Sequence, residues 1–118
     1  IYVRKTYIYS VLRSREEMDE IRDVEKLAEV LRMLANPVRL KMLALIAVKP
    51  RHAYELAKML GLSYPLVHLN LTALEKAGFI EGGYVEGPRT RKVYKLRDFE
   101  IIISKDFLRK LGEGLEGI

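Results

Sequence analysis

The stretch AYELAKMLGLSYPLVHLNLTALEKAG, residues 53–78, decides the fold because two glycines divide it into two short helical segments. Gly61 and Gly78 each follow an amphipathic run, which is the position where glycine ends a helix. We therefore predict one helix over 53–60 and a second over 63–77, joined by the turn GLS. Two short helices joined in this way form a helix-turn-helix, in which the second helix usually reads DNA.

Local signals agree with this division. Ser63 is a favoured N-cap residue, and Pro65 suits the first turn of the helix that follows. In the helix over 53–60, the apolar residues at helical spacing are expected to be buried, and they are Leu56, Ala57 and Leu60.

Two more helices and a strand are predicted upstream of this motif. Apolar residues at spacings of three and four indicate a helix over 15–35, and Asn36-Pro37 ends it because proline restricts the residue before it. Residues 38–48 form the next helix, in which the inward positions are Leu40, Leu43 and either Ile46 or Ala47. Residues 1–9 alternate and are rich in β-branched and aromatic side chains, so they form a strand or, given their two basic residues, a basic arm.

Downstream, residues 79–97 read as a β-hairpin, with the basic tip GPRT at 87–90. The extended character continues over 99–103, a segment that could pair with 1–9 or across a dimer. A short helix over 105–111 follows, and the final GEGLEGI is expected to be mobile.

Helix, helix, helix-turn-helix and hairpin is the order of a winged helix. The segments LANPVRLKMLALI, ELAKMLGLSYPLVHLNLTALEKAGFI and GPRTRKVYKL resemble the arsenic-repressor (ArsR) family of transcriptional regulators, over roughly residues 27–97. The resemblance implies a homodimer that binds double-stranded operator DNA, usually as a repressor that an effector releases. The expected fold is mainly α with a small β-hairpin wing, plus an added N-terminal strand and flanking dimerisation helices.

The best-known members of that family sense a metal through a cysteine pair in the helix that here contains HAYELA. His52 and Tyr54 occupy the matching positions, and the chain has no cysteine. The helix over 105–111 offers Asp106 without a histidine, and one histidine beside one glutamate is too few ligands for zinc. We therefore expect no metal site and no cofactor, and the chemistry of any effector stays open.

The recognition helix has one face for the core and one for DNA. At about 100° per residue, Val67, Leu71 and Leu74 share the core face. Asn70 lies near that face, so a structural hydrogen bond is favoured for it over reading adenine. The DNA-binding residues predicted for the outward arc are Ser63, Tyr64, Pro65, Leu66, His68, Leu69 and Thr72.

This outward arc is short of bidentate donors. Tyr64 and His68 can hydrogen-bond to base edges or phosphates, whereas Leu66 and Leu69 can make only apolar contacts, for instance with thymine methyl groups. Such a face favours A·T-leaning, methyl-sensing or shape-based recognition. The alternative is that both leucines are buried against the wing or another subunit.

Further DNA contacts are predicted at the tip of the hairpin and before the helix over 53–60. There, basic side chains would lie along a minor groove or a line of phosphates and release counterions. The alternative is a solvated turn. The predicted residues are Arg51, His52, Arg89, Thr90, Arg91 and Lys92.

The two flanking helices have apolar stripes that need partners, and we expect them to pack together and onto a second subunit. The dimerisation residues predicted there are Met18, Ile21, Val24, Phe107, Leu108 and Leu111. The chain is accordingly divided into an arm (1–14), a winged helix-turn-helix domain (15–98) and a dimerisation segment (99–118). A two-fold dimer would place its recognition helices roughly 34–36 Å apart.

Composition sets the broad class. A chain of 118 residues with 49% hydrophobic residues is a single globular domain. It contains no apolar run long enough to span a membrane and begins without a signal-peptide pattern, so we expect a cytoplasmic, nucleoid-associated protein with no membrane partner. The absence of Cys, Gln and Trp beside many Lys, Arg and Glu resembles a thermophile composition.

Charge favours a polyanionic partner. Residues 37–98 contain eleven Lys and Arg against five Asp and Glu, an excess of six positive charges. No nucleophile-base pattern or phosphate-binding loop is present, so we do not expect an enzyme. Two alternatives to a regulator remain: an architectural chromatin protein without sequence preference, and a protein-interaction adaptor that docks through the acidic helix over 15–35.

Overall fold

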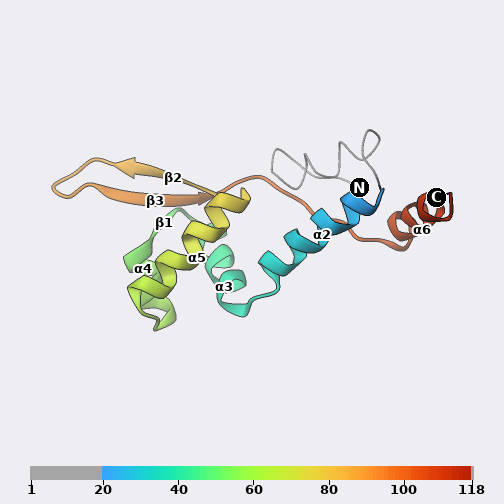
Figure 1. The fold of residues 1–118 in the computed structure, drawn as a ribbon. Helices are drawn as coiled ribbons and strands as arrows, with labels where there is room; N and C mark the ends of the chain where they lie inside the picture. The colour runs from blue at the N-terminus through green and yellow to red at the C-terminus, as the bar shows by residue number, and fades with distance from the viewer. Residues whose placement is uncertain (1–19, 118) are drawn as a thin grey trace. The chain divides into compact units, whose positions relative to one another are not determined.

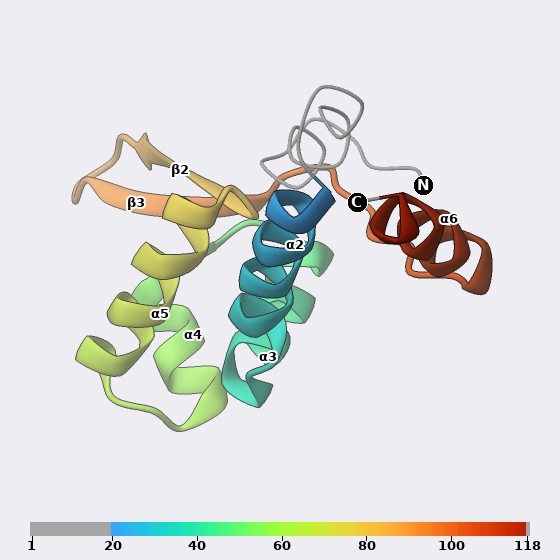
Figure 2. The same ribbon diagram turned by 45° about the vertical axis from the view of Figure 1, so that its right-hand side comes forward.

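The computed structural model describes the backbone of residues 20–117 and the side chains of residues 24–117. Its elements, shown in Figures 1 and 2, are α2 (Glu20–Leu34), α3 (Pro37–Val48), β1 (Arg51–His52), α4 (Ala53–Leu60), α5 (Tyr64–Ala77), β2 (Ile80–Val85), β3 (Arg91–Leu96) and α6 (Lys105–Glu116). The described residues fall into two compact units, one of residues 33–97 and one of residues 20–32 with 98–117. The predicted strand over 1–9 lies outside the described residues.

The helix-turn-helix forms as its glycines predict. Gly61 and Gly78 end α4 and α5 in the left-handed conformation, with φ of 66° and 91°. The Ser63 side chain accepts a hydrogen bond from the amide of Leu66, so it caps the start of α5. The predicted boundaries of both helices are confirmed to within one residue.

Asn36 and Pro37 separate α2 from α3, and they also start α3. The Asn36 Oδ1 accepts hydrogen bonds from the amides of Val38 and Arg39 at 2.9 and 3.2 Å. Pro37 occupies the first helical position, where its missing N–H costs nothing.

The inward face of α3 differs from the prediction. Met42, Leu43 and Ile46 are buried, whereas Leu40 is 51% exposed and Ala47 is exposed. At about 100° per residue, Leu40 lies roughly 110° from the centre of the stripe that the three buried residues form. Because nearly every position of α3 is apolar, the spacing of its apolar residues did not single out one face.

The sheet is antiparallel and has the strand order β1-β3-β2. β2 and β3 form the predicted hairpin, with Ile80 opposite Leu96 at its base and Val85 opposite Arg91 near its tip. We call residues 80–96 the wing. β1 was not predicted, because only two residues, Arg51 and His52, pair with β3.

The core of the 33–97 unit lies between α3, α4, α5 and the base of the wing. The predicted core face of α5 is confirmed, since Val67, Leu71 and Leu74 are fully buried. Phe79 and Ile80 are buried directly after the Gly78 cap, so the end of α5 delivers the chain straight into the sheet. Exposed parts of α5 and the wing are therefore fixed to one core.

The C-terminal segment differs in part from the prediction. Residues 99–103 form no strand with any described segment, and their predicted partner, residues 1–9, lies outside the described residues. The helix after them does not stop at residue 111 but continues to Glu116 as α6. Apolar Leu111 and Leu115, together with the Arg109–Glu113 ion pair, support its later turns at i, i+4 spacing.

The predicted dimerisation residues are only partly described. Val24 and Leu108 are exposed at 37% and 52%, and Leu111 is half-buried. Phe107 is already 95% buried within the chain, so it offers little surface to a partner. The side chains of Met18 and Ile21 lie outside the described residues.

Of the helices that the structure describes, none has the length and apolar character to cross a membrane.

Gly61→Ala should lower the free energy of unfolding by about 1 kcal/mol, because a Cβ strains the left-handed conformation. The matched control is Gly83→Ala on β2. An added Cβ meets no atom within 4 Å at either position, but only Gly61 has a positive φ. The control should change stability by no more than about 0.5 kcal/mol. Equal urea-denaturation midpoints for the two variants would contradict this account.

Candidate nucleic-acid interface

The outward arc of α5 is open to solvent, as predicted. Tyr64 is 50% exposed, Leu66 is 41% exposed and Leu69 is 66% exposed. Ser63, Pro65, His68 and Thr72 are also exposed. Within this chain, therefore, neither leucine is buried against the wing, and the arc is available to another molecule.

Hydrogen bonds within α5 limit which polar groups can read bases. The Thr72 hydroxyl donates to the His68 carbonyl at 2.9 Å, and the Ser63 hydroxyl is used as the helix cap. The rings of Tyr64 and His68 stack with their centroids 5.8 Å apart. The polar side chains of this arc that the helix does not engage in hydrogen bonds are the Tyr64 phenol and the His68 imidazole.

Asn70 has the structural role that the sequence favoured. It is 6% exposed; its Nδ2 donates to the Leu66 carbonyl, and its Oδ1 accepts from Arg39 Nε at 2.8 Å. The same Arg39 guanidinium donates to the Met33 carbonyl. Arg39 thus fixes α5 to α3 and to the end of α2, a role that sequence analysis missed. An arginine within a mostly apolar helix was the available signal.

The wing is anchored to α5 through Glu75. One carboxylate oxygen accepts from Lys92 Nζ at 2.9 Å, and the other accepts from the Gly82 amide at 3.2 Å. A Cβ at Gly82 would overlap Lys92 Cε, so glycine leaves room for this contact. The hydrogen bond to Glu75 raises the pKa of Lys92, although partial burial opposes it. Lys92 was predicted to contact DNA, but its charge is already compensated by Glu75.

Arg51 was predicted to contact DNA, but its side chain is buried and paired within the fold. The side chain is 8% exposed; its Nε donates to the Leu45 carbonyl at 3.1 Å, and its Nη1 binds Glu55 Oε2 at 2.9 Å. The Arg51 hydrogen bond lowers the pKa of Glu55, against the effect of burial. The i, i+4 spacing of the two residues could have indicated this pair.

His52 follows Arg51 in the chain, but its ring contacts the start of α4 and the wing instead of the interior. Its Nδ1 accepts a hydrogen bond from the amide of Glu55 at 3.2 Å, so His52 caps the start of α4. Its Nε2 lies 3.1 Å from Arg91 Nη1 on the wing. This histidine therefore connects the start of α4 with the exposed, basic part of the wing.

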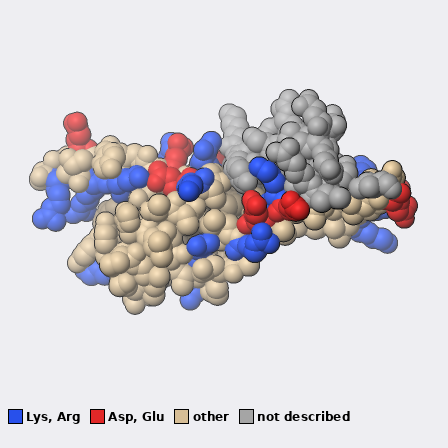
Figure 3. Space-filling view, viewed as in Figure 1, with Lys and Arg blue, Asp and Glu red and all other residues tan. Residues whose placement is uncertain are grey.

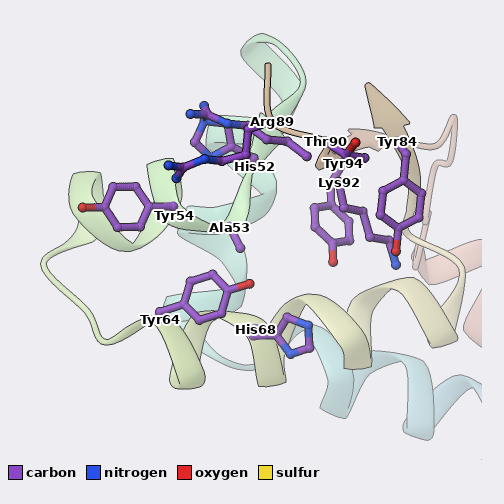
Figure 4. A pocket seen from close by; sticks show the side chains of 11 residues that line it. His52, Ala53, Tyr54, Tyr64, His68, Tyr84, Arg89, Thr90, Lys92 and Tyr94 are labelled. Atoms are coloured by element: carbon purple, nitrogen blue, oxygen red, sulfur yellow. The ribbon is translucent and has the colours of Figure 1, made fainter. Parts of the chain in front are cut away.

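A cleft of about 560 Å³ lies between α4, α5 and the wing, and its lining includes His52, Tyr64, His68, Arg91 and Lys92. Figure 4 shows the Tyr84 and Tyr94 hydroxyls and the Lys92 ammonium pointing from the wing toward α5, where Tyr64 and His68 lie. None of the described lining residues is acidic. Lys and Arg side chains also gather along the wing (Figure 3), and Arg89 and Arg91 are exposed there. A concave, basic and aromatic surface of this kind suits the backbone of a nucleic acid.

The sequence pattern did not indicate the two tyrosines of the wing as site residues. Tyr94 stands opposite Gly82, and Tyr84 opposite Lys92, so both belong to the face that closes the cleft. Burial raises the pKa of Tyr94. No group of three or more His, Asp and Glu side chains that could hold a metal occurs in the described part of the chain.

Known proteins resemble this chain over most of its length. Residues 36–81 match the family described as "Bacterial regulatory protein, arsR family". An uncharacterized HTH-type transcriptional regulator of Methanocaldococcus jannaschii is 40% identical over 92 residues, which span 77% of this chain and 94% of that protein.

Solved structures show the same fold. A homodimeric winged helix-turn-helix DNA-binding domain from Mycobacterium bovis superposes with a TM-score of 0.55 at 26% identity, covering 80% of this chain and 79% of that one. Reduced HlyU from Vibrio cholerae has a TM-score of 0.57 at 21% identity, covering 81% and 93%, and this similarity concerns the fold alone.

Arg51→Ala should lower the free energy of unfolding by about 2 kcal/mol, because it removes a buried ion pair and a hydrogen bond to the Leu45 carbonyl. The control is Arg89→Ala, which removes an exposed arginine and should leave stability within about 0.5 kcal/mol of the parent.

The effect of Arg51→Ala should also depend on pH. The lowered pKa of Glu55 stabilises the fold above the pH at which the unfolded carboxyl titrates, and this contribution disappears as the pH falls. The gap between parent and variant in urea unfolding should therefore narrow in acid. A gap that stays constant down to full protonation of Glu55 would show that the ion pair contributes nothing.

Proposed function

The chain belongs to the ArsR family of helix-turn-helix transcriptional regulators, and on that premise we propose that it is a dimeric repressor that reads DNA with the outward arc of α5. The supporting observation is that Tyr64 and His68 of this arc line the same basic cleft as the wing. In the proposed complex α5 enters the major groove, and the wing follows the flanking backbone or minor groove. Such a regulator works in the cytoplasm, on the nucleoid.

Recognition of bases rests on few groups in this proposal. Tyr64 and His68 supply hydrogen bonds, and Leu69, with Leu66 beside it, supplies apolar contact with thymine methyl groups. No Arg, Asn or Gln stands on the arc, so bidentate contacts to guanine or adenine are absent from this mode. We expect operators that are rich in A·T pairs.

Affinity that is independent of sequence comes from the wing. Arg89 and Arg91 are exposed there, and Thr90 adds a hydroxyl between them. Lys92 contributes less, because Glu75 holds its ammonium. Arg51 is omitted from this set because it is buried.

Dimerisation is proposed through α2 and α6. The Mycobacterium bovis relative is a homodimer, and exposed Val24 and Leu108 are apolar groups that a second subunit would cover. Two recognition helices would then enter successive major grooves, roughly 34–36 Å apart. An effector that controls the repressor is part of the proposal, and its chemistry is open.

A gel-shift experiment with the protein's own promoter against random DNA tests the function. Preference for the promoter supports a sequence-specific regulator. Equal binding to both would favour an architectural chromatin protein, and no binding at low salt would favour an interaction adaptor. In vitro transcription from the same promoter tests the sign, since a repressor lowers the amount of transcript.

Leu69→Ala should reduce the preference for promoter over random DNA several-fold without changing the melting temperature, because this side chain is largely exposed. The control is Val48→Ala, another exposed apolar residue, which lies at the end of α3 and not on α5. It should leave both quantities unchanged. A large drop in melting temperature for Leu69→Ala would mean that Leu69 is buried, for instance at a subunit contact.

A further inference from the structure

We propose that His52 Nε2 and the Arg91 guanidinium together form a seat for one phosphate group, which in the DNA complex is a backbone phosphodiester. This inference rests on the proposed DNA-binding function and deepens it, because it assigns the donor atoms and the tautomer of His52. The observation behind it is a conflict between hydrogen-bond donors around the imidazole ring.

Two N–H donors face the two ring nitrogens of His52. The amide of Glu55 points at Nδ1 from 3.2 Å, and Arg91 Nη1 lies 3.1 Å from Nε2. A neutral imidazole has one acceptor nitrogen and one N–H, and a guanidinium has only donors. The ring can therefore satisfy one of these donors but not both.

Of the two hydrogen bonds, the one from the Glu55 amide to His52 Nδ1 is the one that the fold requires. This amide belongs to the first turn of α4, where an amide has no partner within the helix and depends on the cap. Arg91 is an exposed side chain on the wing and can turn toward another acceptor. Nδ1 thus keeps its lone pair, the proton sits on Nε2, and Nε2–H and the Arg91 N–H face each other as two donors.

Neighbouring carboxylates do not resolve this conflict. Glu55 Oε2 is held by Arg51 at 2.9 Å, and Glu55 Oε1 is 3.9 Å from His52 Nε2, too far for a hydrogen bond. Glu75 is engaged by Lys92 and by the wing backbone. Among the described residues that line the cleft there is no acid to take the place of an external anion.

A phosphate oxygen fits this position, because it has several lone pairs and can accept from both donors at once. The occupant could come from a free phosphate or from the DNA backbone. His52 lines the same cleft as Tyr64 and His68 of α5 (Figure 4), so a strand in contact with the recognition helix passes this seat. That continuity favours the phosphodiester of DNA.

The decisive variant is His52→Asn. Asparagine is among the best N-cap residues, so the start of α4 keeps its cap while the donor at Nε2 is lost. We expect binding of a short random-sequence duplex to weaken by roughly tenfold, the size of one hydrogen bond to a charged acceptor. The melting temperature should stay near that of the parent. His52→Asp should keep the cap too, but weaken binding further, because its charge repels the phosphate.

Salt dependence separates the two members of the seat. Arg91→Ala should lower the slope of log Kd against log salt by about one, because a charged phosphate contact is lost. His52→Asn should weaken binding with the slope unchanged, since a neutral imidazole releases no counterion. The double variant should lose less than the sum of the two single losses, because both groups bind one phosphate. Strictly additive losses, or unchanged affinity of His52→Asn, would overturn the shared seat.

Nitrogen NMR of the histidine side chains tests the seat independently of function. The free protein should show His52 with its proton on Nε2, and an Nδ1–H tautomer would refute the assignment. Inorganic phosphate and the short duplex are then titrated separately. A change at His52 Nε2 with the duplex supports the DNA phosphodiester as occupant. A change with phosphate alone, with no duplex binding, would retain the seat but reject both its DNA occupant and the proposed function. Duplex binding that leaves His52 unchanged would reject the seat and leave the proposed function standing.

Discussion

The carboxylate of Glu75 is the constraint on which the interface depends. One of its oxygens accepts a hydrogen bond from the Gly82 amide and the other binds the Lys92 ammonium, so the last turn of α5 is joined to both strands of the wing. Both charged side chains are about one-third exposed, so the ion pair alone would stabilise little. The backbone hydrogen bond and the missing Cβ of Gly82 give the contact its fixed direction. Without it, the wing would not keep its distance from Tyr64 and His68, and the cleft between them would lose its shape.

Local signals predicted the helix-turn-helix and the hairpin because those features are settled by adjacent residues. Gly61 can adopt the left-handed conformation without a Cβ clash, and Ser63 caps its own helix. Features that depend on packing were not predictable in the same way. The inward face of α3 was assigned to Leu40 although it lies at Met42, because an almost uniformly apolar helix does not mark its own core side. β1 is too short to leave a pattern, and it exists only because β3 lies beside it.

The same distinction between local features and features that depend on packing holds for the candidate site. Periodicity correctly separated the buried face of α5 from its outward arc, and it placed Asn70 on the structural side. Burial of Arg51 could not be inferred from its charge, since Arg51 and Arg91 are the same residue type in similarly basic stretches. Only the fold shows that one guanidinium faces the Leu45 carbonyl and that the other faces His52 at the cleft. The tyrosines of the wing and the Arg39 contact to α5 were missed because they act across elements that are distant in sequence.

These pairings also reduce the number of basic side chains that are available to bind DNA. Residues 37–98 contain eleven Lys and Arg side chains, but Arg51 and Lys92 are each paired with a glutamate, and Arg39 donates to Asn70 in the interior. Within the cleft, Arg89 and Arg91 are then the arginines left exposed to a polyanion. In the proposed complex, two charged phosphate contacts per subunit would give only modest affinity at physiological salt. Tight binding therefore has to combine two subunits on one site, or add uncharged contacts such as the His52 donor and the leucines of α5. In the proposed complex, the net positive charge favours the approach to DNA, whereas the affinity depends on the exposed groups of the cleft, such as Arg89 and Arg91.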